Sequence, residues 1–324
     1  MTNNEDSRHH CPLRRAFRCD ASQLTMPGNY ILITPIKDEL EHLNQLKECV
    51  LGQSVKPILW VIVCSYSKKE SLAFAKSAFE GYRWIHAIEQ SKRYETGYSH
   101  KNFAKAVNEG YAYGKSICSE SGLEYGYVGK TDATPILSPD YFESLIREME
   151  NDSRLMIACG IQKIKYHGSL IDVKPSSNNL MGAFNDIRLY RKKFFEDMGG
   201  YPLAPSPDAI LLIKACNRNL GIKIVESTYF IETRLSGAMI GVWKGNLLKG
   251  KNMYITGYHP LLMVLNSLYL TAKYPPHYQI VPLVLGYFSS LIRGTRKIED
   301  RETLEYFGKT RLIQVIINMY NGGI

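Results

Sequence analysis

Apolar runs of strand length alternate with segments of helical periodicity through the first half of the chain, and this alternation restricts the fold more than any other feature. The runs are YILIT from Tyr30, ILWVIVC at Ile58–Cys64, Trp84–Ile88, the run that ends near Asp132, and LMIACG at Leu155–Gly160. Helices are predicted between them, near 40–50, 71–79 and 101–114. Nearly continuous apolar strands separated by helices predict an α/β chain with a Rossmann-like, mostly parallel sheet that helices cover on both faces.

The segment YGYVGKTDATPILSPDYFE, residues 125–143, places one acid at the end of a strand. Its β-run ends at Asp132, and a carboxylate at the C-terminal tip of a buried strand lies where open α/β sheets bind ligands. Ser138 is predicted to cap the next helix and Pro139 to occupy its first turn. The residues expected to cover the sheet from this helix are Phe142, Leu145, Ile146 and Met149. Asp132 is therefore a candidate to hold a metal-bound diphosphate.

The charge balance favours anionic partners. The chain of 324 residues has 40 Lys and Arg against 31 Asp and Glu, a formal charge of +9. This balance suits nucleotide sugars, lipid phosphates or a membrane surface. The basic residues are scattered, and neither zinc-finger spacing nor an aromatic RNA-binding motif occurs. We therefore predict no nucleic-acid partner.

Cysteine usage and the N-terminal composition indicate the compartment. Seven cysteines are present, none in a CxxC pair. An odd number without such pairs argues against a disulfide framework and favours a reducing, cytoplasmic environment. The polar stretch Met1–Gly28 is predicted to be a disordered tail, and it lacks the apolar core of a secretory signal.

The pattern changes in the second half of the chain. A basic helix is predicted within 182–200, and Pro207 is predicted to open another helix that carries Asp208 near its start. Two apolar segments of roughly a dozen residues follow within 258–294, each too short to span a bilayer. Their tyrosines and basic flanks suit helices lying in a membrane interface, whereas a packed helical subdomain explains the same pattern. The predicted division is 1–28, 29–245 and 246–324.

Several short motifs occur in a fixed order. They are TPIKDE at 34–39, AVNEG at 106–110, Asp132-Ala133-Thr134 followed by SPDYF at 138–142, GAFNDIRLYRKKFFEDMGG at 182–200, and ETRLSG at 232–237. In this order they resemble the family 2 glycosyltransferases, enzymes of the GT-A fold, over residues 30–257. The apolar segments after GYHP, at 257–260, resemble those of membrane-associated members of the family.

The resemblance implies a role for each matched residue. It implies that the end of the first strand contacts the nucleotide through Pro35, Lys37, Asp38 and Glu39. It places a metal at Asp132, where the family usually has DxD, with Glu232 at the usual histidine position, and it makes Asp208 the catalytic base. The candidates to neutralise phosphate oxygens are Lys101, Arg188, Arg191 and Arg234.

The implied cofactor is Mg²⁺ or Mn²⁺, which prefers hard oxygen ligands and would act as a Lewis acid on the departing diphosphate. The chain departs from the family pattern at three places. Thr134 replaces the second acid of the metal motif, Glu232 replaces a histidine, and AILLIKA after Asp208 lacks a further acid. These departures concern activity more than fold.

The resulting expectation is a metal-dependent inverting glycosyltransferase of polysaccharide biosynthesis. It would move a hexosyl group from a nucleotide sugar, a UDP-sugar first of all, to a glycan or lipid-linked acceptor, with peripheral membrane contact left open. The alternative is a catalytically degenerate GT-A protein that binds a nucleotide sugar or a partner without turnover. A nucleotidyltransferase is disfavoured because no Gly-rich phosphate loop follows the first strand, and the absence of GxGxxG and Walker motifs disfavours dinucleotide oxidoreductases and P-loop NTPases.

Overall fold

The computed structural model describes residues 28–37, 40–65, 69–91, 100–166, 169–173, 187–233, 241–273 and 277–320. Apart from Gly28, the predicted disordered tail lies outside these residues. So do three predicted site residues, Asp38, Glu39 and Arg234.

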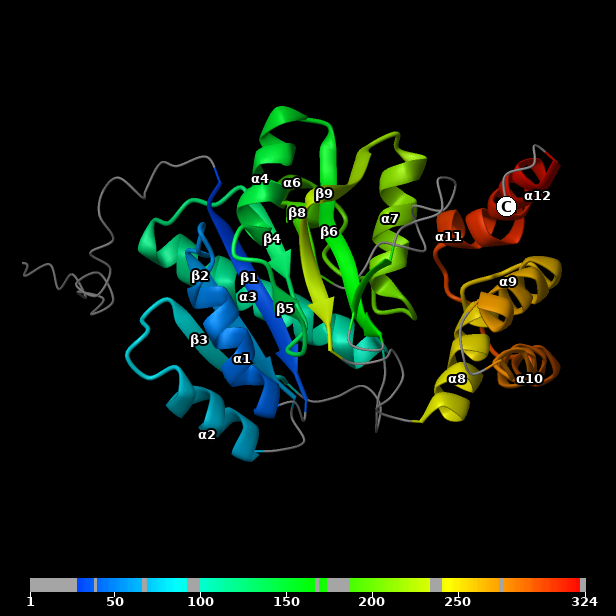
Figure 1. Cartoon of the computed structure of the whole chain (residues 1–324), viewed down its shortest axis with the longest axis horizontal. Helices are drawn as coiled ribbons and strands as arrows, with labels where there is room; N and C mark the ends of the chain where they lie inside the picture. The colour runs from blue at the N-terminus through cyan, green and yellow to red at the C-terminus, as the bar shows by residue number, and fades with distance from the viewer. Residues whose placement is uncertain are drawn as a thin grey trace, which may run out of the picture.

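Strands and helices alternate through residue 151 as predicted, except that two strands follow one another within 127–137 (Figure 1). The strands are β1 (Tyr30–Ile36), β2 (Leu59–Cys64), β3 (Ile85–Glu89), β4 (Tyr127–Lys130), β5 (Ile136–Leu137), β6 (Leu155–Tyr166), β7 (Ser169–Val173), β8 (Arg188–Arg191) and β9 (Gly221–Glu232). The helices of this part are α1 (Leu40–Leu51), α2 (Lys69–Ala78), α3 (His100–Ser121), α4 (Tyr141–Asn151), α6 (Lys192–Asp197) and α7 (Pro207–Asn217).

One sheet collects these strands in the order β3-β2-β1-β4-β8-β6-β9-β5, with β7 paired to β6. Its first four strands are parallel neighbours, and β9 runs parallel to β6. Because β8 is antiparallel to both β4 and β6, these two strands point the same way. The carboxyl ends of β1, β4, β6 and β9 therefore meet at one edge of the sheet, where β8 begins. This mixed but largely parallel sheet confirms the predicted α/β fold.

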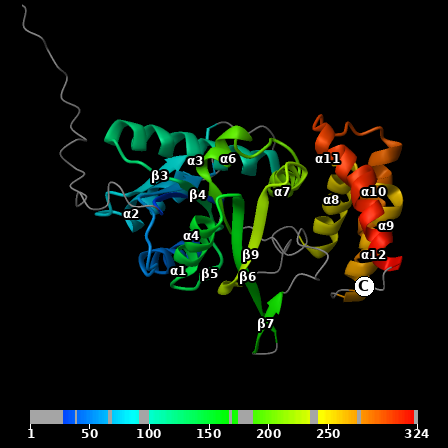
Figure 2. The same cartoon turned by 90° about the horizontal axis from the view of Figure 1, so that it is seen from above.

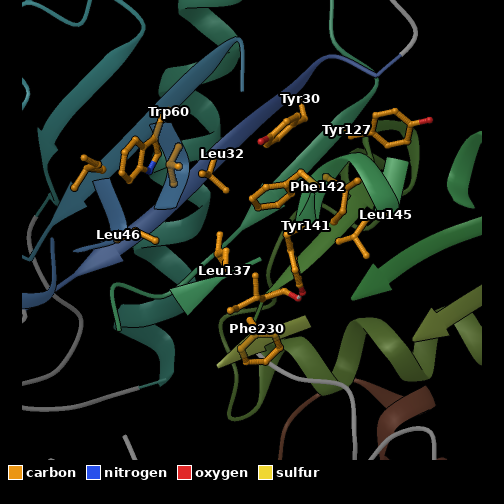
Figure 3. Packing of buried hydrophobic residues seen from close by; sticks show 14 of the residues in the cluster. Tyr30, Leu32, Leu46, Trp60, Tyr127, Leu137, Tyr141, Phe142, Leu145 and Phe230 are labelled. Atoms are coloured by element: carbon orange, nitrogen blue, oxygen red, sulfur yellow. Dashed lines mark hydrogen bonds between the residues drawn. The ribbon is translucent and has the colours of Figure 1, made fainter. Parts of the chain in front are cut away.

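Helices cover both faces of the sheet. Helices α1, α2 and α4 pack on one face around Trp60, Tyr30 and Phe142, where the Trp60 indole N–H donates to the Thr34 hydroxyl at 2.9 Å (Figure 3). Helices α3, α6 and α7 pack on the other face around Ile33 and Val61. The nearly continuous burial of β1 and β2 follows from this double cover, since no side chain of a central parallel strand faces solvent.

One local prediction is confirmed in part, and another is wrong. The basic helix predicted within 182–200 forms at 192–197, but the residues before it, Arg188–Arg191, form strand β8, which was not predicted. Pairing with β4 and β6 on both sides outweighs the helical preference, and Arg188 is buried. Helix α4 begins at Tyr141 with Asp140 at its N-cap. The Ser138 hydroxyl lies 2.6 Å from that of Thr228 and caps nothing.

The AVNEG motif has a structural explanation. A Cβ on Gly110 would lie 2.7 Å from a methyl group of Val63 and 2.8 Å from one of Ile33, so glycine lets α3 approach the sheet closely. Asn108 accepts from the Tyr201 N–H and donates to the Tyr201 carbonyl, both at 2.8 Å. The motif thus ties α3 to the turn after α6.

We predict that Asn108→Ala lowers the free energy of unfolding by about 2 kcal/mol, because it leaves a backbone N–H and a carbonyl without partners. Urea denaturation measures this change. Asn151→Ala is the matched control, since Asn151 is exposed in the last turn of α4, and it should shift stability by less than about 0.5 kcal/mol. Equal shifts in the two variants would show that the Asn108 bridge does not stabilise the fold.

The C-terminal helices lie beside α7 at one end of the molecule (Figures 1 and 2). They are α8 (Val242–Ile255), α9 (Pro260–Lys273), α10 (Ile280–Ile292), α11 (Arg301–Glu305) and α12 (Arg311–Tyr320), with a π-helical turn at Tyr306–Thr310. Ion pairs Lys214–Asp300, at 2.7 Å, and Arg218–Glu302, at 2.9 Å, join α7 to α11. Within the described ranges, no helix combines the length and apolarity needed to cross a bilayer.

Candidate active site

Asp132 lies just beyond β4, at the edge where the parallel strands end. Its carboxylate Oδ1 is 2.7 Å from the Nζ of Lys130, the last residue of the strand. The Lys130 side chain is only 2 % exposed and that of Asp132 is 34 % exposed. The Lys130 ammonium also lies 4.7 Å from the centre of the Phe103 ring. A buried cation therefore holds one oxygen of Asp132 while the carboxylate keeps access to solvent.

Asp208 is held in a similar way by a buried arginine. Arg188 Nη2 lies 3.1 Å from Asp208 Oδ2, and Nη1 donates to the Asp208 carbonyl at 2.8 Å. The Arg188 side chain is 1 % exposed and that of Asp208 is 25 % exposed. Ser206, just before the helix, has a left-handed backbone with φ 52° although it precedes a proline, and such strain is common where a site fixes a side chain.

The two ion pairs are neighbours because of strand register. Lys130 on β4 pairs with Arg188 on β8, and side chains of directly paired residues lie on the same face of a sheet. Two buried cations thus stand side by side, and each holds an acid that reaches the open edge. The two acids come from distant parts of the chain, the β4 loop and the first turn of α7.

His100 begins α3 close to Asp208. Burial lowers the pKa of the His100 imidazole, and the Asp208 carboxylate acts in the opposite direction. Further from the edge, the hydroxyls of Tyr190 and Tyr201 lie 2.8 Å apart, and burial raises the pKa of both. The buried side chains around the two acids are therefore of two kinds. His100, Tyr190 and Tyr201 are kept uncharged by burial, and Lys130 and Arg188 form ion pairs.

Glu232 ends β9 at the same edge and meets the metal motif from the other side. The Thr134 hydroxyl lies 3.4 Å from Glu232 Oε1, and the Thr233 hydroxyl donates to the Thr134 carbonyl at 2.8 Å. A carboxylate at the end of β9 thus lies beside Thr134, the residue that stands in place of the second acid of the motif.

The remaining predicted residues divide into two groups. Pro35 at the end of β1 and Lys37 just after it lie at the carboxyl edge, and Lys101 is exposed in the first turn of α3 beside His100. Arg191 lies elsewhere.

Arg191 pairs with Tyr127, the first residue of β4, and so lies at the opposite edge of the sheet. Its guanidinium donates to the carbonyls of Met149 at 2.5 Å and Leu155 at 3.2 Å. The prediction that Arg191 binds phosphate at this site is therefore wrong. The residue joins the end of α4 to the start of β6.

Two residues that sequence analysis missed are Lys130 and His100. The available signal for Lys130 was a single charge in the otherwise uncharged run YVGK, two residues before Asp132. His100 carried no comparable signal. Its place near Asp208 depends on the tertiary arrangement of α3 and α7 and not on a motif.

The side chains at this edge supply only some of the ligands that a divalent cation needs. In the described residues, no cluster of three or more His, Cys, Asp and Glu side chains could hold a metal ion. Asp132 and Glu232 nevertheless offer two hard oxygen donors at one edge. Mg²⁺ is commonly bound by one or two carboxylates together with substrate phosphates and water. These two residues therefore suit a cation that arrives with a diphosphate.

No protein-family model matches the sequence, and no curated protein matches it significantly. Solved structures do match. Mannosyltransferase PcManGT from Pyrobaculum calidifontis, in complex with GDP-Man and Mn²⁺, superimposes with a TM-score of 0.53 at 12 % identity, over 91 % of this chain and 88 % of that chain. The chain has a GT-A-like fold.

A second match is S. aureus TarS 1–349. Its TM-score is 0.49 at 12 % identity, over 89 % of this chain and 78 % of that chain. At 12 % identity the likeness to PcManGT concerns the fold.

Proposed function

We propose that this chain is an inverting glycosyltransferase that moves a hexosyl group from a nucleotide sugar to a hydroxyl of a glycan or lipid-linked acceptor. The observation that carries the proposal is the pair of buried cations, Lys130 and Arg188, which present Asp132 and Asp208 at the carboxyl edge of a GT-A-like sheet. Asp132 suits the binding of a metal and diphosphate, and Asp208 suits the removal of a proton from the acceptor hydroxyl. The resemblance favours a UDP-sugar, and PcManGT, bound to GDP-Man, adds GDP-sugars as candidates.

Asp208 would act as the general base. One carboxylate oxygen is held by Arg188, so the other can accept the proton of the acceptor hydroxyl. As that proton leaves, the acceptor oxygen forms a bond to the anomeric carbon from the face opposite the nucleotide. The bond from the anomeric carbon to the diphosphate oxygen breaks, and the nucleoside diphosphate departs with the electron pair. This in-line displacement inverts the anomeric configuration.

Asp132 and Glu232 would hold Mg²⁺ or Mn²⁺ together with the donor. Bound there, the metal supplies charge neutralisation on the leaving diphosphate. Lys130 keeps the Asp132 carboxylate in place through its 2.7 Å contact. Lys37, just after β1, and Lys101, in the first turn of α3, remain candidates for phosphate contacts. Asp38, Glu39 and Arg234 keep their proposed nucleotide and phosphate roles from the resemblance alone.

We predict that Glu232→Gln raises the Mn²⁺ concentration needed for half-maximal turnover by about tenfold or more, because a lost ligand should cost at least as much as a lost outer-shell partner. Turnover measured against Mn²⁺ after chelation with EDTA gives this value. Glu226→Gln is the matched control, since Glu226 is an exposed acid on the same strand. An unchanged Mn²⁺ requirement in Glu232→Gln would remove Glu232 from the metal site.

The proposed reaction is tested by incubating the purified chain with Mn²⁺ and a panel of UDP- and GDP-sugars. Transfer to an acceptor, or slow hydrolysis of one donor, supports the proposal. Two features favour one competing function, nucleotide-sugar binding without catalysis. They are Thr134 in place of the second acid of the metal motif and the Lys130–Asp132 ion pair. Thermal stabilisation by a nucleotide that does not depend on metal, together with no turnover of any donor, would establish that competitor.

A further inference from the structure

The positive charge of the chain is concentrated in residues 233–298, which include helices α8, α9 and α10. Between Glu232 and Glu299 there are eight Lys or Arg residues and no Asp or Glu. Of the 40 basic residues, 32 therefore remain for the rest of the chain, against all 31 acidic ones. The rest of the chain is almost neutral, and the formal charge of +9 belongs almost entirely to this one stretch.

Part of that charge surrounds a pocket of about 280 Å³ between α8 and α10. Three cations line it, Lys244, Lys251 and Arg293, together with two serines and a threonine of α10 and its end. In the described part of the chain, none of these three cations forms an ion pair. The pocket is thus a concentration of unpaired positive charge.

Close packing of the two helices fixes the pocket. A Cβ on Gly250 would lie 2.0 Å from the Leu283 carbonyl oxygen, and one on Gly286 would lie 2.0 Å from the Leu247 carbonyl oxygen. The two backbones therefore touch, and the cations project from a rigid base. A preorganised cluster of this kind binds an anion at lower entropic cost than flexible surface lysines do.

Exposed apolar side chains surround the same helices. Of the twenty large apolar side chains exposed in the described residues, eleven lie between 242 and 292. Leu247 lines the pocket itself, and Trp243 packs on Tyr278 with ring centres 6.1 Å apart. On α10, Leu285 and Ile292 share a face with Ser289 of the pocket, and Ile292 is 85 % exposed. Charge and apolar surface are thus combined.

We propose that this α8–α10 surface, made of Lys244, Lys251, Arg293, Trp243, Leu247, Leu285 and Ile292, docks the protein on an anionic lipid bilayer. A headgroup phosphate would bind among the three cations, and the apolar side chains would enter the boundary between headgroups and acyl chains. Nucleic acid has the phosphates but offers no apolar layer for Leu285 and Ile292. Docking of this kind is independent of sugar transfer.

Flotation of the full chain with vesicles tests the docking surface. Wild type should bind phosphatidylcholine vesicles that contain phosphatidylglycerol, bind pure phosphatidylcholine far less, and lose binding as salt rises. The triple variant Lys244→Gln, Lys251→Gln and Arg293→Gln should bind anionic vesicles about 100-fold more weakly, since each basic residue near an anionic leaflet contributes about fivefold. Leu285→Ser with Ile292→Ser should also weaken binding while the charge is unchanged.

The matched control removes three exposed lysines from the catalytic part, Lys56, Lys76 and Lys193, each changed to Gln. It should bind anionic vesicles like wild type. Equal loss in the control and the triple variant would reduce the effect to net charge and overturn the proposal. So would binding of inorganic phosphate or an oligonucleotide without vesicle binding. Donor hydrolysis in the triple variant should stay at the wild-type rate, so that failure here leaves the proposed function untouched.

Discussion

Asp208→Asn is expected to lower kcat for sugar transfer by about 10² to 10⁴, the usual contribution of a general base. The amide cannot accept the proton of the acceptor hydroxyl, but it keeps the size of the carboxylate and can still accept a hydrogen bond from Arg188. Donor affinity should change little, because Asp208 lies in the first turn of α7 and is assigned to the acceptor. Steady-state kinetics and nucleotide binding by calorimetry separate the two quantities.

Asp197→Asn provides the control for this substitution. Asp197 ends α6, is exposed, and pairs with Lys193 one turn away at 3.0 Å, so its replacement should leave kcat unchanged. Circular dichroism and thermal unfolding check that Asp208→Asn still folds, because the buried Arg188 loses its counter-charge. A folded Asp208→Asn variant with wild-type kcat would exclude Asp208 as the base.

The parallel half of the sheet could be predicted because its strands are apolar on both faces and its helices carry one apolar face. Strand β8 could not, since its RLYR sequence has the composition of a basic surface helix. Burial between β4 and β6 decides its conformation, and that is a long-range effect. Strand β9 was missed for a related reason, because its pairing with β6 contains register shifts and its burial does not alternate regularly.

The prediction of the site was limited in the same way, by contacts between residues far apart in sequence. Asp132 and Asp208 could be proposed from the sequence because each stands at an element boundary that the sequence marks with turn residues. Their buried partners were not found, because the Lys130–Arg188 pairing is set by the register of two strands far apart in sequence. Register also explains the wrong prediction for Arg191. In a strand of four residues, Arg188 and Arg191 lie at opposite edges of the sheet.

The C-terminal helices are fixed relative to the site through α7. Its first turn carries Asp208, and its later turns bind α11 through Lys214–Asp300 and Arg218–Glu302. Ile213 of the same helix packs against Tyr306 and Phe307. A bilayer bound at the α8–α10 surface would therefore hold a constant position relative to the proposed base. This arrangement suits an acceptor that is itself anchored in lipid.

Lys130→Met is expected to lower kcat/KM for the donor by about 10² to 10³, the cost of removing one preorganised group that stabilises charge. Methionine keeps the length of the side chain and its packing on Phe103, but it removes the ammonium that holds Asp132 Oδ1 at 2.7 Å. The carboxylate then loses its fixed position, and the diphosphate loses a nearby positive charge. Lys47→Met is the matched control, since Lys47 lies over the Tyr82 ring at 5.2 Å and donates to a carbonyl on the far face.

The double variant with Asp132→Asn shows whether the two residues act as one unit. If Lys130 acts by positioning Asp132, the double variant should be about as impaired as the worse single variant, because both substitutions remove the same ion pair. If Lys130 only stabilises the fold, the loss should follow the thermal unfolding of each variant and add to that of Asp132→Asn. Additive losses in kcat/KM would therefore show that Lys130 does not act by positioning Asp132. They would assign the diphosphate to Asp132 and Glu232 without help from the buried lysine.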